Sequence, residues 1–512
     1  MHSYDIPKHS TAILGGLILL IWYAATLLQR KWRQNCFVRE NQCKPPSQLP
    51  SKLLGLDIIL QTIAAAKQRR VLELGLSRFQ HYGNTLKFRN LTKTMITTRE
   101  PQNIKTILSL RFKDYSLGDR IQTFGPLLGH GIFTTDGEHW AQSRSMVRSG
   151  FSKDRIAHLD IFEELMGDLF ELIPTDGSTV DLQDLFFCYT MDSATDFLFG
   201  HSVRALKKYG HNPGDETGQD FGSAFNYAQD SIATRVRMGP LKFLHRDRKA
   251  QDANRRCHEL AEEFVDKALS YRQTLNENGS AGDDTSAEKS KSLFLHKLAQ
   301  QTGDRTRIRD ELMNVLLAGR DTTASLLSNM FFVLAKKPEI WAKLQGEIAV
   351  LEGRAPTYDQ LRNLTYLKYC MNESLRLHPV VPVNARLAVV DTVLPVGGGR
   401  DGQSPVFVPK GTTVRYSLYS MHRREDFYGP DAQEYRPERW EKLRMGWEYL
   451  PFNGGPRICV GQQYALTEAA YVTVRLAQKF PILESRDPGS WKENLTLTLC
   501  SHNGCHVSLQ HA

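Results

Sequence analysis

The sequence predicts a large, mainly α-helical domain with a small β portion. No proline occurs between Pro240 and Pro338, so most of that stretch is free to form helices. From Ala388 to Thr413, in contrast, β-branched residues alternate with Gly and Pro, a pattern that is typical of short strands and turns. With 512 residues, the chain is long enough to bury a large core in one enzyme-sized fold.

The composition excludes several classes of protein. Hydrophobic residues make up 41% and aromatic residues 10% of the chain, more than a disordered protein carries. The formal net charge of +9 suits an anionic membrane surface or an acidic protein partner. Apart from the basic residues after the first apolar segment, no dense Lys/Arg tract is present, so nucleic-acid binding is not expected. The eight cysteines are scattered without a CxxC pair, which indicates reduced thiols in a cytosolic compartment.

The N-terminal segment predicts a membrane anchor. Residues 11–28 carry no charge and, at about 1.5 Å per residue, are just long enough to cross a thin bilayer. Arg30, Lys31 and Arg33 follow at once, so the positive-inside rule leaves the rest of the chain in the cytosol. A cleaved signal peptide is the alternative, but the charge order is reversed and no small-residue cleavage site follows. We therefore expect a short lumenal N-terminus (residues 1–10), a single transmembrane helix (11–28), a basic and Pro-rich linker (29–50) and one main domain (51–512).

Within the main domain, three segments have clear boundaries. Residues 276–292 are rich in Gly, Ser, Asp and Glu and are expected to form an exposed loop. The best-defined helix begins near Asp304 and runs to Lys337, where Pro338 ends it. An apolar-periodic run from Gln462 to Phe480 predicts a helix directly after a Gly-rich loop.

That Gly-rich loop, from Phe452 to Gly461, carries the strongest chemical signal. It leads into Cys459, whose predicted place at the start of a helix favours a thiolate. With no second cysteine nearby, Cys459 cannot build a zinc site, but a single thiolate can be the axial ligand of a haem iron. Gly455 and Gly461 would let the backbone approach a flat macrocycle. Taken alone, such a cysteine is more often a small buried hydrophobe.

The loop has the form FxxGxRxCxG and resembles the haem-binding loop of the cytochrome P-450 superfamily at every defined position, Phe452 included. Three further motifs of that family follow the family's order along the chain. They are Trp140-Ala141-Gln142-Ser143-Arg144, Ala318-Gly319-Arg320-Asp321-Thr322-Thr323, and Glu373-Ser374-Leu375-Arg376 with Arg439 as a later partner. The resemblance covers nearly all of the main domain and implies the cytochrome P-450 fold, a haem b cofactor and a haem-thiolate catalytic domain over residues 51–512.

The resemblance also implies roles for individual residues. Thr322 and Asp321 would deliver protons during oxygen activation, whereas the alternative is a helix kink with a capped hydroxyl and a surface carboxylate. Glu373, Arg376 and Arg439 would lock the fold behind the haem and are structural. The haem propionates would be held by an aromatic residue and three arginines, namely Trp140, Arg144, Arg386 and Arg457.

The finer assignment points to a substrate class. The segments 125–133, 448–457 and 461–468 look like the fungal branch that hydroxylates alkanes and fatty acids, so we expect oxidation of a long aliphatic chain near its terminus. A tailoring monooxygenase of a secondary-metabolite pathway would keep the same motifs. A non-oxygenating electron carrier or gas sensor, and a haem-thiolate isomerase or dehydratase, are alternatives of other classes. The apolar pocket is expected from Phe124, Leu127, Leu128, Leu316, Leu317, Ala318, Val380, Val381, Pro382 and Val383.

The expected partners follow from what the sequence lacks. No flavin or nicotinamide motif is apparent, so electrons would come from an NADPH-cytochrome P-450 reductase. The predicted location is the endoplasmic reticulum membrane, with the catalytic domain in the cytosol.

Overall fold

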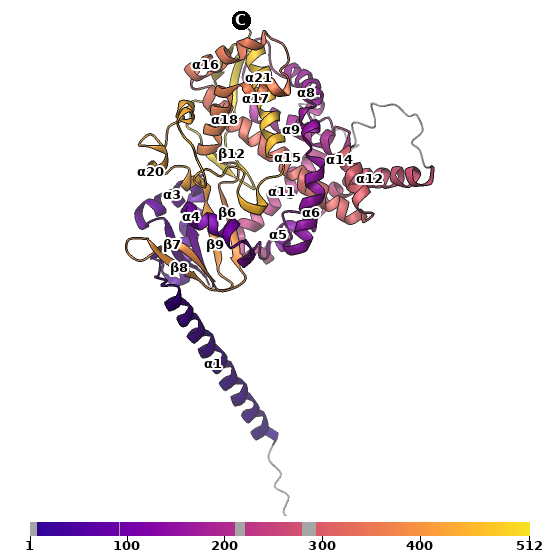
Figure 1. Ribbon diagram of the computed structural model, residues 1–512. Helices are drawn as coiled ribbons and strands as arrows, with labels where there is room; N and C mark the ends of the chain where they lie inside the picture. The colour runs from indigo at the N-terminus through magenta and orange to yellow at the C-terminus, as the bar shows by residue number, and fades with distance from the viewer. Residues whose placement is uncertain (1–7, 92, 210–220, 279–292, 512) are drawn as a thin grey trace, which may run out of the picture. The chain divides into compact units, whose positions relative to one another are not determined.

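The computed structural model describes residues 8–91, 93–209, 221–278 and 293–511 (Figure 1). The chain forms two compact units. The first comprises Met1–Ile58, Arg78–Ser116 and Arg386–Arg415, and the second comprises Ile59–Ser77, Leu117–Ala385 and Tyr416–Ala512. The predicted mainly α-helical fold with a small β portion is confirmed.

The first unit holds most of a six-stranded sheet with the order β1-β2-β3-β9-β6-β4. Strand β1 is parallel to β2, whereas β2 is antiparallel to β3. The predicted strand region yields β6, the antiparallel hairpin β7–β8, and β9. The strands are β1 (Ser47–Gln48), β2 (Thr85–Asn90), β3 (Lys93–Thr98), β4 (Tyr115–Ser116), β6 (Val383–Ala388), β7 (Thr392–Gly398), β8 (Ser404–Val408) and β9 (Thr413–Ser417). Helix α4 (Pro101–Lys105) and the helical turns Thr106–Leu110 and Phe112–Asp114 belong to the same unit.

Helix α1 (Lys8–Glu40) contains the predicted spanning segment. Its apolar side chains between residues 17 and 28 are largely exposed, Leu19 and Ile21 among them. Among the described residues, no helix is both long and apolar enough to cross a membrane. In the predicted linker (29–50), no Gly or Pro interrupts residues 29–40, and the helix continues to Glu40. The last turns of α1 pack on the β7–β8 hairpin, where the rings of Phe37 and Phe407 lie 5.5 Å apart.

The second unit contains nearly all the other helices and two small sheets, β10-β13-β5 and β11-β12. The strands are β5 (Val180–Asp181), β10 (Ile482–Ser485), β11 (Glu493–Leu495), β12 (Leu499–Ser501) and β13 (His506–Gln510). Helix α2 (Leu56–Lys67) begins in the first unit and continues in the second, whereas helix α3 (Val71–Tyr82) begins in the second unit and ends in the first. The other helices of the second unit are α5 (Arg120–Leu128), α6 (Gly137–Gly150), α7 (Lys153–Ala157), α8 (Asp160–Glu171), α9 (Leu182–Phe199), α10 (Ala205–Lys208), α11 (Phe221–Met238), α12 (Arg248–Asn278), α14 (Leu293–Gln301), α15 (Arg305–Leu334), α16 (Pro338–Ile348), α17 (Tyr358–Asn363), α18 (Thr365–Leu377), α19 (Leu418–Met421), α20 (Glu425–Tyr428) and α21 (Gln462–Lys479).

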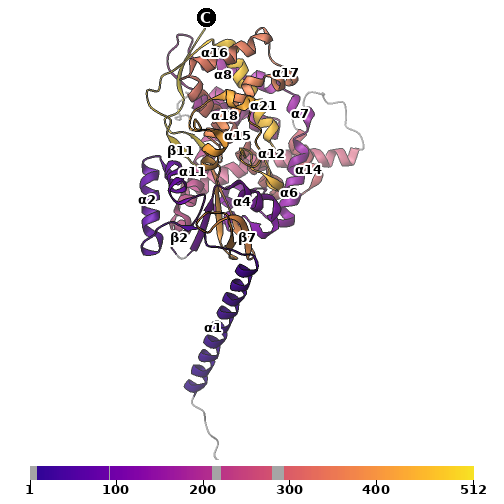
Figure 2. The same ribbon diagram turned by 60° about the vertical axis from the view of Figure 1, so that its left-hand side comes forward.

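Helix α15 is the centre of the second unit (Figures 1 and 2). It packs against α9, α12, α18 and α21, and most of its residues are buried. Asp304 caps its first turn by accepting from the backbone N–H of Arg307 at 3.1 Å, as the predicted start requires. The helix ends at Leu334, three residues before the predicted Lys337, and α16 begins at Pro338.

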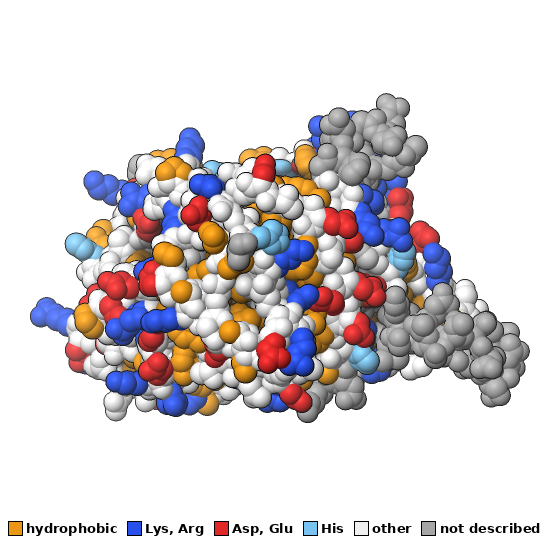
Figure 3. All heavy atoms as spheres, turned by 90° about the horizontal axis from the view of Figure 1, so that it is seen from above, with side chains coloured by type: hydrophobic (Ala, Val, Ile, Leu, Met, Phe, Trp, Pro, Cys, Tyr) orange, Lys and Arg blue, Asp and Glu red, His pale blue; other side chains and the backbone are white. Residues whose placement is uncertain are grey.

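The predicted loop over residues 276–292 is wrong at its start, because α12 runs through Asn278. The rest of that loop, residues 279–292, lies outside the described residues. On the face drawn in Figure 3, basic and acidic side chains are interspersed.

Candidate active site

The cysteine loop folds back on itself before α21. The backbone N–H of Cys459 donates to the carbonyl of Phe452 at 3.0 Å. Asn453 and Gly455 adopt positive φ angles of 63° and 68°, which let the chain reverse direction. A Cβ at Gly454 would lie 2.9 Å from the ring of Trp447, so this position requires glycine. The loop therefore has one compact conformation, with Cys459 near its end.

The place of Cys459 differs slightly from the prediction. Gly461 caps α21, so Cys459 lies two residues before the helix cap and not in its first turn. Its side chain is exposed, whereas Cys257, Cys370, Cys500 and Cys505 are buried. The surrounding loop nonetheless raises the pKa of the Cys459 thiol by desolvation, while the backbone N–H of Gly461 and the Arg144 guanidinium lower that pKa.

The donor set fits a group that needs one protein sulfur. In the part of the chain that the structure describes, no group of three or more His, Cys, Asp or Glu side chains could hold a metal ion. Cys459 is thus an accessible thiol outside any multidentate cluster. This matches the single axial thiolate of a haem and does not match a zinc site.

Three of the four predicted propionate-binding residues meet beside this loop. Arg144 on α6 donates to the carbonyl of Ile458 at 2.9 Å. The Arg457 guanidinium lies 4.3 Å from the centre of the Trp140 ring. Arg144 lies four residues after Trp140 on α6, yet the cation over the Trp140 ring is Arg457. Arg386 lies on β6 in the first unit and is buried.

Arg457 also fixes a second loop. Its Nη2 forms an ion pair with Asp136 Oδ1 at 2.7 Å and donates to the carbonyl of Thr135 at 2.9 Å. Its Nη1 donates to the carbonyl of Ile132 at 3.3 Å. Sequence reasoning missed Asp136, which no motif marks.

The other end of this second loop is held by α15. Asp310 Oδ2 accepts from the backbone N–H of His130 at 2.7 Å, and Asn314 Oδ1 accepts from that of Phe133 at 3.0 Å. A Cβ at Gly129 would collide with the Asp310 carboxyl, and a Cβ at Gly131 with the Asn314 amide. Sequence reasoning missed Asp310 and Asn314, although the two glycines were the available signal.

The proton-relay candidates lie on α15. The Thr322 hydroxyl donates to the carbonyl of Ala318 at 2.7 Å, inside its own helix. Asp321 is buried, not a surface residue, and pairs with Arg320 at 2.9 Å. Burial raises the pKa of Asp321, whereas Arg320 and the Gln229 amide of α11 lower it. A Cβ at Gly319 would lie 3.4 Å from the Ala194 Cβ of α9, an ordinary van der Waals contact, so α9 packs beside this position without requiring glycine.

The structural triad forms one buried ionic cluster. Glu373 Oε1 accepts from Arg376 Nη2 and from Arg439 Nε, each at 2.8 Å. Its Oε2 accepts from Arg376 Nε at 2.9 Å and from Trp440 Nε1 at 3.0 Å. Asp431 pairs with Arg439 at 3.2 Å. Trp440 and Asp431 were not anticipated, although Trp440 directly follows Arg439.

The predicted apolar pocket is only partly right. Leu127, Leu128 and Leu316 are fully buried in the core of the second unit, because neighbouring helices cover them completely. Leu317, Val380 and Pro382 are also buried. Apolar surface stays accessible on the half-buried residues of the predicted set, namely Phe124, Ala318, Val381 and Val383.

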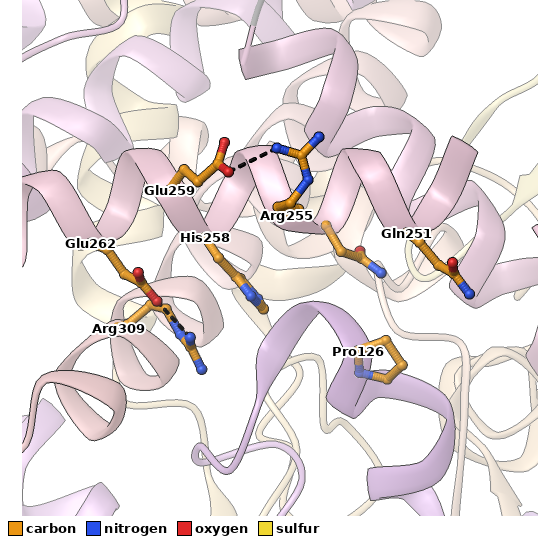
Figure 4. Close-up of a pocket in the computed structure, with 8 residues that line it drawn as sticks. Pro126, Gln251, Arg255, His258, Glu259, Glu262 and Arg309 are labelled. Carbon is orange, nitrogen blue, oxygen red and sulfur yellow. Dashed lines mark hydrogen bonds and ion pairs between the residues drawn. The ribbon is translucent and has the colours of Figure 1, made fainter. Parts of the chain in front are cut away.

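A separate groove between α5, α12 and α15 is polar (Figure 4). Its walls carry the ion pairs Arg309–Glu262 and Arg255–Glu259, at 2.7 and 2.9 Å. His258 joins α12 to α5 through a 2.8 Å hydrogen bond with the carbonyl of Leu127. With charged side chains already paired along it, this groove is unsuited to an apolar substrate.

The chain is similar to known proteins over most of its length. The sequence profile of the family described as Cytochrome P-450 matches residues 53–502. The chain is 50% identical to Cytochrome P-450 monooxygenase himC of Aspergillus japonicus, over 100% of this chain and 91% of the relative. It is 47% identical to Cytochrome P-450 monooxygenase fsdH of Fusarium heterosporum, over 98% and 89%. It is 44% identical to Cytochrome P-450 52A3-A of Candida maltosa, over 98% and 97%.

Proposed function

The chain belongs to the cytochrome P-450 family and is a haem-thiolate monooxygenase, and from this premise we propose that it hydroxylates a long-chain alkane or fatty acid at or near the chain terminus. The himC and fsdH relatives are monooxygenases by name, which disfavours the alternatives of an electron carrier, a gas sensor, an isomerase or a dehydratase. The observation that carries the proposal is the accessible apolar surface on Phe124, Ala318, Val381 and Val383.

The chain's own residues would hold the cofactor. Bound haem supplies the activation of dioxygen, with electrons from an NADPH-cytochrome P-450 reductase. The Cys459 thiolate would bind the haem iron, and Gly455, Gly461 and Phe452 would shape the loop around it. Arg144, Arg457 and Trp140 would bind the propionates, and we include Arg386 because of its place in the family pattern.

Asp321 and Thr322 would move the proton. Burial raises the pKa of Asp321, although its ion pair with Arg320 lowers that pKa, so this carboxylate takes up a proton more readily than an exposed one. The Thr322 hydroxyl donates to Ala318, yet its oxygen can still accept a second hydrogen bond and pass a proton on.

The substrate class is tested by chain length. Each buried methylene contributes about 0.8 kcal/mol, so affinity should rise about three- to fourfold per methylene until the accessible apolar surface is covered. Spectral titration of the holoenzyme with saturated acids and alkanes of increasing length measures this dependence. Val381→Ala should reduce the slope, whereas Leu351→Ala, a core change on another part of the unit, should leave it unchanged.

The opposite outcome is equally informative. If the shift to high spin does not depend on chain length, the aliphatic substrate is rejected. The second candidate, a tailoring monooxygenase of a secondary-metabolite pathway, would then be favoured. The chain is 50% and 47% identical to the himC and fsdH monooxygenases and 44% identical to 52A3-A, and these similarities do not decide the substrate.

We also propose that α1 attaches the protein to the endoplasmic reticulum membrane as a single-pass anchor, with the catalytic domain in the cytosol. The support is the exposure of Leu19 and Ile21, 66% and 67%, in an uncharged segment followed by basic residues. Leu19→Asp with Ile21→Asp should release the protein from membrane fractions. Leu60→Asp, at 64% exposure on α2, is the control, and equal release by both variants would refute the anchor.

A further inference from the structure

A buried histidine that no sequence motif marks contacts the chain just before the cysteine loop. His422 directly follows α19, is 0% exposed and lies in the second unit. Its Nε2 accepts from the backbone N–H of Leu450 at 3.0 Å. The other ring nitrogen, Nδ1, has no hydrogen-bond partner among the described residues. The hydrogen bond with Leu450 and the ring of Tyr449, 5.3 Å away, therefore set the position of this imidazole.

The imidazole of His422 is uncharged at neutral pH. Burial, together with the positive charges of Arg376 and Arg423, lowers the pKa of His422 to about 3. An uncharged imidazole keeps a lone pair on one ring nitrogen, whereas a protonated ring presents two donors. Because the ring stays uncharged, Nε2 can accept from the Leu450 N–H throughout the physiological pH range.

Leu450 is connected in turn to the cysteine. Its carbonyl accepts from the backbone N–H of Asn453 at 3.0 Å, and the carbonyl of Phe452 accepts from that of Cys459 at 3.0 Å. The Tyr416 hydroxyl donates to Asn453 Oδ1 at 3.2 Å. The stretch from Leu450 to Cys459 is thus closed by its own backbone hydrogen bonds, and a displacement of Leu450 would move the cysteine with it.

His422 is also bound to the buried ionic cluster around Glu373. Its backbone carbonyl accepts from Arg376 Nη1 at 2.9 Å, and the same guanidinium pairs with Glu373 at 2.8 Å. The Tyr449 hydroxyl donates to the carbonyl of Asn372 on α18 at 3.0 Å. His422 therefore joins two structures, the ionic cluster through its backbone carbonyl and the cysteine loop through its ring.

We infer that His422 is a positioning residue, which holds the cysteine loop against the ionic cluster through Leu450 and so keeps the Cys459 sulfur where it can bind the haem iron. Without this acceptor, the N–H of the buried Leu450 would lose its partner, and the loop would shift to relieve that cost. The inference rests on the proposed role of Cys459.

The test replaces the ring in the holoenzyme and follows the ligand by its spectrum. His422→Leu removes the acceptor, whereas His422→Gln restores one, because the glutamine Oε1 lies about as far along the side chain as Nε2. The control is Tyr435→Phe, which also removes one buried hydrogen bond, from the Tyr435 hydroxyl to the carbonyl of Cys370 at 2.7 Å. The readouts are Tm and the rate at which the red-shifted Soret band of the reduced carbon monoxide complex is lost.

The expected results separate positioning from a general effect on stability. His422→Leu should lose the red-shifted band about tenfold faster than wild type, the effect of one buried donor left unpaired. His422→Gln should stay within about threefold of wild type. His422→Leu and Tyr435→Phe should both lower Tm, but Tyr435→Phe should keep the band as long as wild type does.

The inference is overturned if the band is as durable in His422→Leu as in wild type, or if it is lost equally fast in Tyr435→Phe. If His422→Leu does not fold, His422→Asn takes its place, because the asparagine amide is one methylene shorter and lies where Nδ1 was. The band should then be lost faster in His422→Asn than in His422→Gln, and equal rates would reject the inference.

Cys459→His distinguishes this inference from the proposed function. If Cys459→His keeps the red-shifted band, the proposed ligand is wrong and the inference fails with it. If Cys459→His loses the band while His422→Leu behaves as wild type, the ligand stands and the positioning role of His422 alone is rejected.

Discussion

Glu373 offers the sharpest test of how the second unit is held together. Five donors converge on its two oxygens, from Arg376, Arg439, Trp440 and the backbone N–H of Arg436. The side chains of Glu373 and Arg376 are 0% exposed and that of Arg439 is 2% exposed. Glu373→Gln keeps the shape but removes the charge, and it turns an amide donor toward N–H groups that need an acceptor.

The size of the effect follows from that burial. Breaking a buried ion pair by neutralising one partner costs about 3–5 kcal/mol, because the remaining charges stay buried without compensation. Unfolding entropy of about 2.1 cal/mol/K per residue, over the roughly 450 residues matched by the family profile, gives roughly 0.9 kcal/mol/K. Glu373→Gln should therefore lower Tm by about 3–5 °C.

Thermal unfolding of the holoenzyme at one fixed scan rate measures this shift. The control is Glu259→Gln on α12, the same substitution in an exposed pair with Arg255 at 2.9 Å. Water solvates both partners there, so Tm should scarcely change. Equal shifts for Glu373→Gln and Glu259→Gln would refute the reasoning, since burial is the only difference on which it depends.

Three other outcomes are expected. Cys459→His should abolish the red-shifted Soret band of the reduced carbon monoxide complex, and survival of that band with its loss in Cys370→Ser would reassign the ligand. Thr322→Ala should keep haem binding and the substrate-induced spectral shift but divert NADPH to peroxide. An unchanged yield of product per NADPH would leave the Thr322 hydroxyl with no role beyond its hydrogen bond within α15. The free energy of unfolding should fall as pH rises from 4.5 to about 8, because burial raises the pKa of Glu468 to about 8 and the folded state binds a proton that the unfolded state has released. Urea unfolding at several pH values measures this, and Glu468→Gln should flatten the profile. Parallel profiles of the wild type and the variant would contradict the prediction.

Much of the fold could be predicted from the sequence, because local sequence signals and tertiary packing favour the same elements. Asp304 is a good helix cap and no proline interrupts the next thirty residues, so α15 begins where the sequence places it. The C-terminal end of α1 could not be predicted in the same way. The predicted linker was defined by charge and by Pro45 and Pro46, but charge does not end a helix, which therefore continues to Glu40.

Sequence motifs predict which residues form the site, but not which of these residues contact one another. Spacing places Trp140 and Arg144 on one face of α6, yet it cannot show that Arg457, more than three hundred residues later, lies over the Trp140 ring. Hydrophobicity likewise cannot separate a pocket wall from the core. Leu128 and Phe124 differ little in type, but only Phe124 keeps accessible surface.

The loop from residue 129 to 136 gives a physical reason why the ligand and α15 act together. Its first half is bound to α15 through Asp310 and Asn314, and its second half is bound to Arg457, two residues before Cys459. A shift of the cysteine loop would therefore pull on α15 through hydrogen bonds that are partly buried and costly to break. This connection restricts movement between the two elements, and such restriction is what a site needs when its ligand lies on a loop and its proton donor on a helix.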